Sequence, residues 1–208
     1  MLHLSTILMV AMNPATMLTV SRLGIAPVFS FCFLAGFGPG KGPGWLWGAF
    51  LCLVLIEISD ALDGYVARKR SEVTNFGKIF DPICDSLSRQ TVFVTFAIAG
   101  IIPIWLFLLF LYRDGIMSFM RIMCAAEGTV VAARMTGKIK AVLQGICSFG
   151  VVGVALAHGY NIEAVPRTLW GQHPGFWIIL PVAIFTVLSA IDYFVPAWPV
   201  LQRQMKPH

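Results

Sequence analysis

Long apolar runs separated by short polar or glycine-rich stretches make up most of the chain. Six such runs can be marked, at residues 18–37, 45–64, 79–101, 104–123, 140–160 and 177–195. An apolar run of about 20 residues is long enough for a helix to cross the hydrocarbon core of a bilayer. The pattern therefore predicts an all-α, polytopic membrane protein with six transmembrane helices.

The composition supports the same class of protein. Of the 208 residues, 58% are hydrophobic and only 12% are charged, and the mean hydropathy is +0.80. A soluble domain carries about 25% charged residues, and a single core cannot hide this much apolar surface. We expect one membrane domain over residues 1–208, in which residues 1–15 form a short interfacial helix, residues 16–195 the six-helix bundle and residues 196–208 a cytoplasmic tail.

The distribution of basic residues sets the expected orientation in the membrane. Of the 15 Lys and Arg residues, only Lys41 and Arg167 lie in the loops assigned to one face. Because Lys and Arg concentrate in cytoplasmic loops, we expect the opposite face and both termini in the cytoplasm. The basic residues are scattered between apolar runs rather than gathered in a stripe, which argues against a nucleic-acid-binding protein. The five cysteines form no CxxC pair, so neither a disulfide framework nor a zinc site is indicated.

Four carboxylates gather where the second apolar run ends and the third begins. They are Asp60, Asp63, Asp81 and Asp85. At these spacings each pair shares one face of a helix, and two antiparallel helices would bring the pairs together. A carboxylate near hydrocarbon is costly unless it faces a polar cavity and a partner. The alternative explanation is structural salt bridging to the basic residues nearby, which are Arg68, Lys69, Arg70 and Arg89.

The chemistry of these four side chains favours hard divalent cations. Oxygen ligands with no His or Cys nearby select Mg²⁺ or Mn²⁺ over Zn²⁺ or copper. Four aspartates can hold two such ions, an arrangement that suits displacement at phosphorus. Gly64, Ala67 and Gly77 leave the neighbouring helix surfaces bare, so a flat ligand group can approach the backbone there. Close packing of helices through small residues explains them equally well.

Together these positions spell a recognisable motif. The pattern Asp60-x2-Asp63-Gly64-x2-Ala67-Arg68-x8-Gly77-x3-Asp81-x3-Asp85 resembles the signature of the CDP-alcohol phosphotransferase family. The resemblance implies that the four aspartates bind two divalent metal ions and that Asp85 removes the proton of the acceptor hydroxyl. The residues that it places at the CDP site are Asp60, Asp63, Gly64, Ala67, Arg68, Thr74, Gly77 and Thr16.

Three further blocks extend the resemblance toward the bacterial phosphatidylglycerophosphate synthases of this family, over about residues 13–150. They are Thr16-x2-Thr19-x2-Arg22-x4-Pro27, Arg113-Asp114-x3-Ser118-x2-Arg121 and Gly137-Lys138-x-Lys140-x3-Gln144. The resemblance implies a bacterial inner-membrane enzyme that transfers the phosphatidyl group of CDP-diacylglycerol to glycerol 3-phosphate and releases CMP. Two Mg²⁺ or Mn²⁺ ions would be its cofactors.

The phosphate of such an acceptor needs cations. The candidates are Arg113, Arg121, Lys138 and Lys140, although contact with anionic headgroups explains basic residues near the membrane as well. Asp114 can instead pair with one of them. Three alternatives stay open: another acceptor, such as inositol phosphate, serine or another polyol phosphate; an intramembrane prenyltransferase; and a divalent-cation transporter. An apolar face of the bundle would also suit a homodimer.

Overall fold

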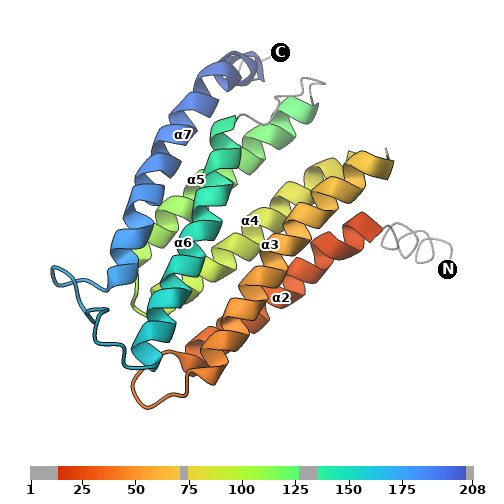
Figure 1. The fold of residues 1–208 in the computed structure, drawn as a ribbon. Helices are drawn as coiled ribbons and strands as arrows, with labels where there is room; N and C mark the ends of the chain where they lie inside the picture. Colours follow the sequence, from red (N-terminus) through yellow and green to blue (C-terminus); the bar gives the residue numbers. More distant parts are fainter. Residues whose placement is uncertain (1–13, 71–74, 127–134, 205–208) are drawn as a thin grey trace. The chain divides into compact units, whose positions relative to one another are not determined.

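The computed structural model describes residues 14–70, 75–126 and 135–204, and side chains over 19–62, 83–120 and 136–190. In these ranges the chain forms a series of long helices (Figure 1). These ranges contain no strand beyond an isolated bridge between Leu169 and Gln172. The helices are α2 (Pro14–Gly36), α3 (Gly44–Arg70), α4 (Asn75–Ile98), α5 (Ile104–Ala126), α6 (Met135–Gly159) and α7 (Pro174–Gln204). Each of the six predicted apolar runs therefore lies on a helix. The predicted interfacial helix falls almost wholly on residues 1–13, outside the described part.

Two of these helices extend beyond their apolar runs into the polar sequence between the second and third runs. Helix α3 continues past Gly64 to Arg70, and α4 begins at Asn75, ahead of the third run. The extra turns carry Ala67, Arg68 and Gly77 of the aspartate motif. Ala, Arg and Lys sustain a helix as well as apolar residues do, so the backbone hydrogen-bonding continues where the hydrophobicity ends.

The chain divides into two compact units, and each is described by itself. The first comprises residues 1–95 and 155–163, and its centre is the antiparallel pair α2 and α3. Phe29, Phe33 and Leu53 are buried there. The helices approach closely at Gly36, where an added Cβ would lie 2.9 Å from the side chain and the backbone nitrogen of Leu46. The nearby Tyr160 hydroxyl accepts a 3.0 Å hydrogen bond from Trp47 Nε1.

The second unit comprises residues 96–154 and 164–208, and contains α5, most of α6 and α7. Helix α6 packs against α7, because the Cys147 thiol donates to the Ile178 carbonyl at 3.3 Å and Gly150 faces the same residue. One turn further along α6, the buried Val151 lies against Gly175. Helix α5 contacts α7 as well. Helix α7 therefore covers the face of α6 that carries residues 147, 150 and 151.

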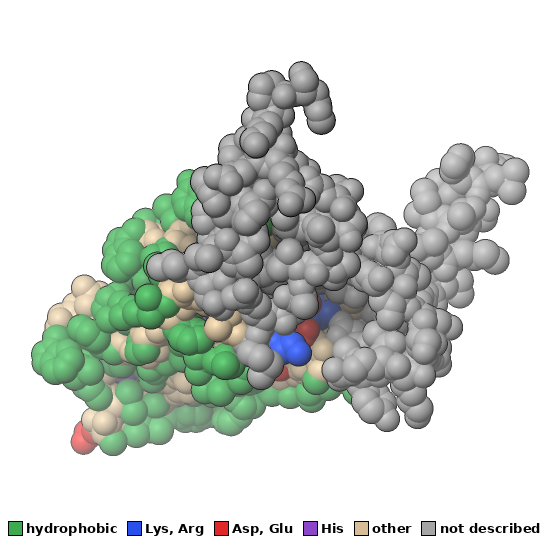
Figure 2. All heavy atoms as spheres, turned by 90° about the horizontal axis from the view of Figure 1, so that it is seen from above, with side chains coloured by type: hydrophobic (Ala, Val, Ile, Leu, Met, Phe, Trp, Pro, Cys, Tyr) green, Lys and Arg blue, Asp and Glu red, His purple; other side chains and the backbone are tan. Residues whose placement is uncertain are grey.

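Three of the described helical segments are long and apolar enough to cross a membrane. They are Thr19–Gly36, Gly44–Leu62 and Thr136–Gly159, and Pro174–Ala190 is a shorter apolar segment. Large apolar side chains on these segments are exposed, including Phe31 at 63% and Ile146 at 61%. Figure 2 shows a described surface that is mostly hydrophobic, with acidic and basic side chains together in one small area. Such a surface is stable against lipid rather than water, as expected of a membrane protein.

Candidate active site

The aspartate motif lies on helical backbone on both sides of residues 71–74. Asp60 and Asp63 occupy α3 and Asp81 and Asp85 occupy α4. Of the four side chains, those of Asp60 and Asp85 are described. The predicted site residues whose side chains fall outside the described ranges are Thr16, Asp63, Gly64, Ala67, Arg68, Gly77, Asp81 and Arg121, and Thr74 falls outside the described backbone.

The first unit brings Asp60 and Asp85 to the same guanidinium group. Arg22 of α2 donates from NH1 to Asp60 Oδ1 at 2.8 Å, and the same nitrogen forms an ion pair with Asp85. The Arg22 side chain is 2% exposed, whereas the Asp60 and Asp85 side chains are 36% and 30% exposed. Three helices therefore meet at one buried positive charge, with the two carboxylates partly open to their surroundings. We call Arg22, Asp60, Asp85 and Arg89 the carboxylate cluster.

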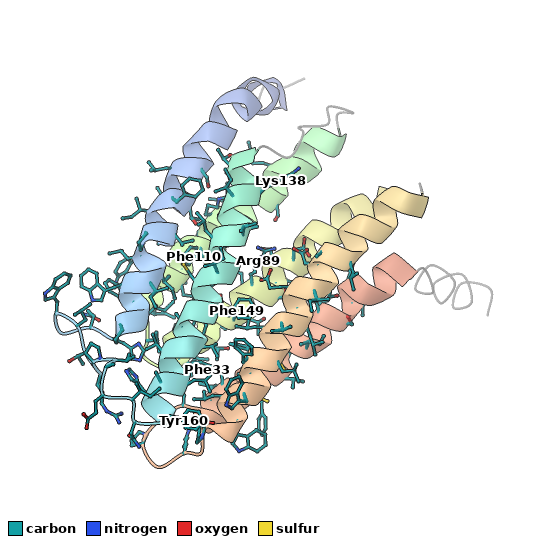
Figure 3. All side chains as sticks on the ribbon, viewed as in Figure 1. Phe33, Arg89, Phe110, Lys138, Phe149 and Tyr160 are labelled. Carbon is teal, nitrogen blue, oxygen red and sulfur yellow. The ribbon has the colours of Figure 1, made fainter. Side chains whose placement is uncertain are left out.

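Arg89 completes this cluster from α4, one turn beyond Asp85. Its NH2 lies 3.5 Å from Asp60 Oδ2, and its side chain is 17% exposed. Figure 3 labels Arg89 within the bundle. The described part of the cluster thus sets two carboxylates against two guanidinium groups. The salt bridging to Arg89 that the sequence offered as an alternative is present here.

Arg22 is a site residue that the sequence analysis treated only as part of a motif and of the charge distribution. A signal for it was available, because an arginine inside an apolar helix needs an acidic partner to offset the cost of its burial. The acidic residues at the end of the second apolar run and the start of the third could supply one. Which carboxylates Arg22 contacts depends on how α2, α3 and α4 pack, and the sequence pattern does not predict that packing.

The donor atoms at this cluster are of the kind that a hard divalent cation prefers. Asp60 and Asp85 offer carboxylate oxygens, and both already lie against one positive group, so their oxygens can converge on a cation. Among the described side chains, no group of three or more His, Cys, Asp or Glu residues comes together. The two described carboxylates supply oxygen ligands of the type that Mg²⁺ or Mn²⁺ prefers, and the motif predicts Asp63 and Asp81 as the further ligands.

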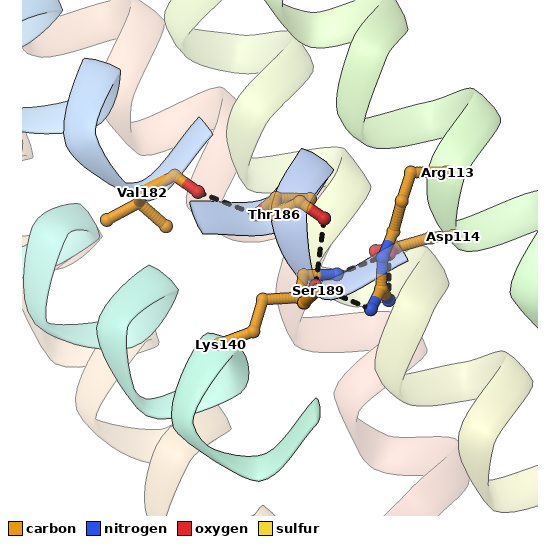
Figure 4. Close-up of polar contacts among 6 residues, drawn as sticks. All are labelled: Arg113, Asp114, Lys140, Val182, Thr186 and Ser189. Carbon is orange, nitrogen blue, oxygen red and sulfur yellow. Dashed lines mark hydrogen bonds and ion pairs between the residues drawn. The ribbon is translucent and has the colours of Figure 1, made fainter. Parts of the chain in front are cut away.

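A second charged cluster lies in the second unit (Figure 4). Arg113 of α5 donates to Asp114 Oδ1 at 3.1 Å and to the Ser189 hydroxyl of α7 at 2.9 Å. Lys140 of α6 forms an ion pair with the same Asp114 oxygen. Asp114 and Lys140 are 8% and 5% exposed. We call Arg113, Asp114, Lys140 and Ser189 the cation cluster.

The local structure fixes this cluster from the α7 side. The Ser189 hydroxyl donates to the Thr186 carbonyl at 2.8 Å, and the Thr186 hydroxyl donates to the Val182 carbonyl at 2.7 Å. Both hydroxyl hydrogens are therefore committed to the helix, and the Ser189 oxygen is left as the acceptor for Arg113. The Nε of Arg113 is buried and has no hydrogen-bond partner among the residues that the structure describes, so this guanidinium retains a donor for a ligand.

Of the four residues predicted to bind the acceptor phosphate, the structure brings Arg113 and Lys140 together. Asp114 joins them, as the sequence left open. Lys138, near the start of α6, is exposed (Figure 3). The buried Lys140 and the 11% exposed Arg113 are held by one carboxylate. Such a pair can bind a phosphate group, since arginine offers forked donors and lysine a mobile point charge.

Comparison with known proteins places this sequence in a family. Residues 12–189 match the sequence profile of the CDP-alcohol phosphatidyltransferase family. Over 199 residues the chain is 32% identical to the CDP-diacylglycerol--glycerol-3-phosphate 3-phosphatidyltransferase of Bacillus subtilis, covering 91% of this chain and 97% of that protein. Proteins of the same name from Treponema pallidum and Mycoplasma genitalium are 33% and 34% identical, over 74% and 76% of this chain and 71% and 66% of their own lengths. The chain therefore belongs to the CDP-alcohol phosphatidyltransferase family.

Proposed function

We propose that the protein transfers the phosphatidyl group of CDP-diacylglycerol to a hydroxyl of glycerol 3-phosphate, releasing CMP and forming phosphatidylglycerophosphate. The observation that carries this proposal is the similarity, along 91% of the chain, to a relative whose name states that activity. The carboxylate cluster supports the reaction class, because it contains the aspartate that the family resemblance assigns as the base. The cation cluster supports an acceptor that carries a phosphate.

In the proposed reaction the acceptor hydroxyl oxygen forms a bond to the phosphorus that carries diacylglycerol. The bond between that phosphorus and the oxygen bridging the two phosphates breaks, and CMP leaves with its electron pair. The proton of the hydroxyl passes to the Asp85 carboxylate. Arg22 holds Asp60 and Asp85 at one place, so the base is positioned before substrate arrives.

Asp60, Asp63, Asp81 and Asp85 would hold two Mg²⁺ or Mn²⁺ ions. When bound, such ions neutralise charge on the diphosphate and on the departing group. Gly64, Ala67, Arg68, Thr74, Gly77 and Thr16 remain the proposed surroundings of the CDP group. They lie on or beside α2, α3 and α4, the helices that also supply the carboxylate cluster.

The cation cluster is the proposed site of the acceptor phosphate. Asp114 holds Lys140 and Arg113 together, and the buried Nε of Arg113 offers a donor for a phosphate oxygen. Serine carries no phosphate and would leave this donor without a partner. The cluster therefore favours glycerol 3-phosphate or another polyol phosphate over serine. Arg121 and Lys138 complete the set that the sequence predicts, and we give Lys138 the smaller part because it is exposed.

We propose that all six described helices cross the membrane, with both termini and the active site on the cytoplasmic side of a bacterial inner membrane. Lengths of 23 residues or more for every one of these helices support this topology. The ends of α3 and α5 and the start of α6 carry the basic residues, as cytoplasmic ends do. An even number of crossings returns the chain to the side on which it starts.

The test is CMP release from CDP-diacylglycerol by the purified protein, run with Mg²⁺ or Mn²⁺ across a panel of acceptors. We expect release that requires glycerol 3-phosphate, stops with EDTA and returns when the metal is restored. In the Asp85→Asn variant the rate should fall by about 10² to 10⁴, the usual contribution of a general base. Release that depends instead on inositol phosphate would support the same transfer reaction with a different acceptor. Folded protein that releases no CMP with any acceptor would refute the proposal, and divalent-ion flux would then be measured.

A further inference from the structure

One buried polar side chain beside the cation cluster has no hydrogen-bond partner within the described part of the chain. Gln144 lies on α6, one turn beyond Lys140, and is 1% exposed. Neither its Nε2 nor its Oε1 has a hydrogen-bond partner among the residues that the structure describes. Buried amides are nearly always hydrogen-bonded, since leaving both ends of the group unpaired is costly. Such an amide in a membrane helix therefore calls for a ligand.

The position of Gln144 on its helix places it on the enclosed side of the second unit. Lys140, at i−4, contacts Asp114 of α5. Cys147 and Val151, at i+3 and i+7, lie against Ile178 and Gly175 of α7. Residues at these spacings form one face of a helix. Gln144 thus lies between the residues by which α6 contacts the rest of its unit, on the same face as a proposed phosphate-binding lysine.

The two unpaired atoms identify the chemistry of the missing partner. Nε2 is a donor and Oε1 is an acceptor, so a single group that pairs with both atoms accepts from Nε2 and donates to Oε1. A phosphate oxygen or a carboxylate only accepts, whereas a hydroxyl does both. Glycerol 3-phosphate has two hydroxyls, and in the proposed reaction one of them attacks phosphorus and loses its proton. The other is free to pair with an amide.

We propose that Gln144 binds the hydroxyl of the acceptor that does not react, and so helps to select glycerol 3-phosphate. This inference rests on the proposed function and adds a specificity-determining residue to it. The acceptor phosphate binds Arg113 and Lys140, and the Gln144 amide, one turn further along α6, hydrogen-bonds the hydroxyl that does not react. A site built to hydrogen-bond a substrate hydroxyl rejects an analogue that lacks it, because its own polar groups are then left unpaired.

The test compares two acceptors in two proteins. The acceptors are glycerol 3-phosphate and 3-hydroxypropyl phosphate, which keeps the phosphate and the attacking hydroxyl but lacks the second one. In the unmodified protein we expect kcat/KM to favour glycerol 3-phosphate by about tenfold or more. In Gln144→Met, which keeps the length of the side chain but removes its polar atoms, we expect the two acceptors to fall within about threefold of each other, mainly through a higher KM for glycerol 3-phosphate.

A matched control lies one turn further along the same helix face. The Ser148 hydroxyl donates to the Gln144 backbone carbonyl at 2.9 Å and so is already paired. Ser148→Ala should keep the preference for glycerol 3-phosphate. Gln144→Met should also fold at least as stably as the unmodified protein, because it removes buried polar atoms that lack partners.

Two results would overturn the inference while leaving the proposed function intact. One is an unmodified protein that uses both acceptors equally well. The other is a Gln144→Met variant that loses activity by the same factor with each, as a purely structural residue or one bound to a buried water would. An unmodified protein that releases no CMP with glycerol 3-phosphate would overturn the proposed function itself, and this inference with it.

Discussion

Replacing Arg22 by methionine tests the carboxylate cluster most directly. Methionine keeps much of the length and apolar stem of the side chain but removes the charge that lies between Asp60 and Asp85. The two carboxylates would then lose the charge that lies between them, while Arg89 stays 3.5 Å from Asp60. We expect the variant to fold, bind detergent normally and unfold at a lower temperature than the unmodified protein.

The size of the effect follows from the contacts. A hydrogen bond to a charged group contributes about 1.5–3 kcal/mol, and breaking a buried ion pair costs about 3–5 kcal/mol. Both carboxylates are about one-third exposed, so water screens part of this interaction. We therefore expect a loss of about 3 kcal/mol in the free energy of unfolding, which lies at the low end of the range for a buried pair. For a protein of this length that is about 6–12 °C in Tm.

The assay is thermal unfolding in detergent, followed with a thiol-reactive dye that reports the exposure of buried cysteines such as Cys32 and Cys84. Arg89→Met is the matched control, since its longer and more exposed contact should contribute less. Saturating Mg²⁺ should raise the Tm of Arg22→Met by more than that of the unmodified protein, because a cation no longer competes with the guanidinium. An Arg22→Met variant as stable as the unmodified protein, or less affected than Arg89→Met, would refute the account of this cluster.

Two further predictions concern the acceptor site and the packing of α2 on α3. Lys140→Met should raise the KM for glycerol 3-phosphate by about 10- to 100-fold, the value of one charge-assisted contact, and Lys138→Met should raise it less, because Lys138 is exposed and Lys140 is 5% exposed; steady-state kinetics of CMP release measures both, and equal effects would contradict the assignment. Gly36→Ala should cost about 1–3 kcal/mol, since its Cβ would lie 2.9 Å from Leu46, whereas Gly24→Ala on the same helix meets nothing within 4 Å and should stabilise the protein by about 0.5–1 kcal/mol; thermal unfolding of the two variants decides, and the reverse order would show that the helices do not pack as described.

The helices could be predicted because their cause is local. A run of apolar residues near 20 in length has few stable forms in a membrane other than a helix, and each such run lies on one. The ends of α3 and α4 could not be predicted in the same way. Their last and first turns are polar, and hydropathy does not distinguish a polar helix that leaves the membrane from a loop.

The composition of the two charged clusters could be predicted only in part. The aspartate motif predicted Asp60 and Asp85 as site residues, and the basic blocks predicted Arg113 and Lys140 as residues that bind the acceptor phosphate. A buried arginine in an apolar helix predicts an acidic partner, but the pattern alone does not select both Asp60 and Asp85 for Arg22, or both Arg113 and Lys140 for Asp114. Those pairings join helices that are far apart along the chain, and only their packing decides them. The unpaired amide of Gln144 is visible only once its surroundings are known.

The two clusters resemble each other with the signs reversed. In the first, Arg22 lies between two carboxylates, and in the second, Asp114 lies between two cations. A group of like charges in a medium of low dielectric constant is unstable unless an opposite charge offsets it. The residue at the centre of each cluster supplies that charge and thereby stabilises the fold. It also competes with the ligand that the surrounding residues attract, a divalent cation at the first cluster and a phosphate at the second. At each cluster, the central residue that stabilises the fold therefore lowers the affinity for the ligand. For the carboxylate cluster, the rise in the Tm of Arg22→Met on adding Mg²⁺ measures this effect.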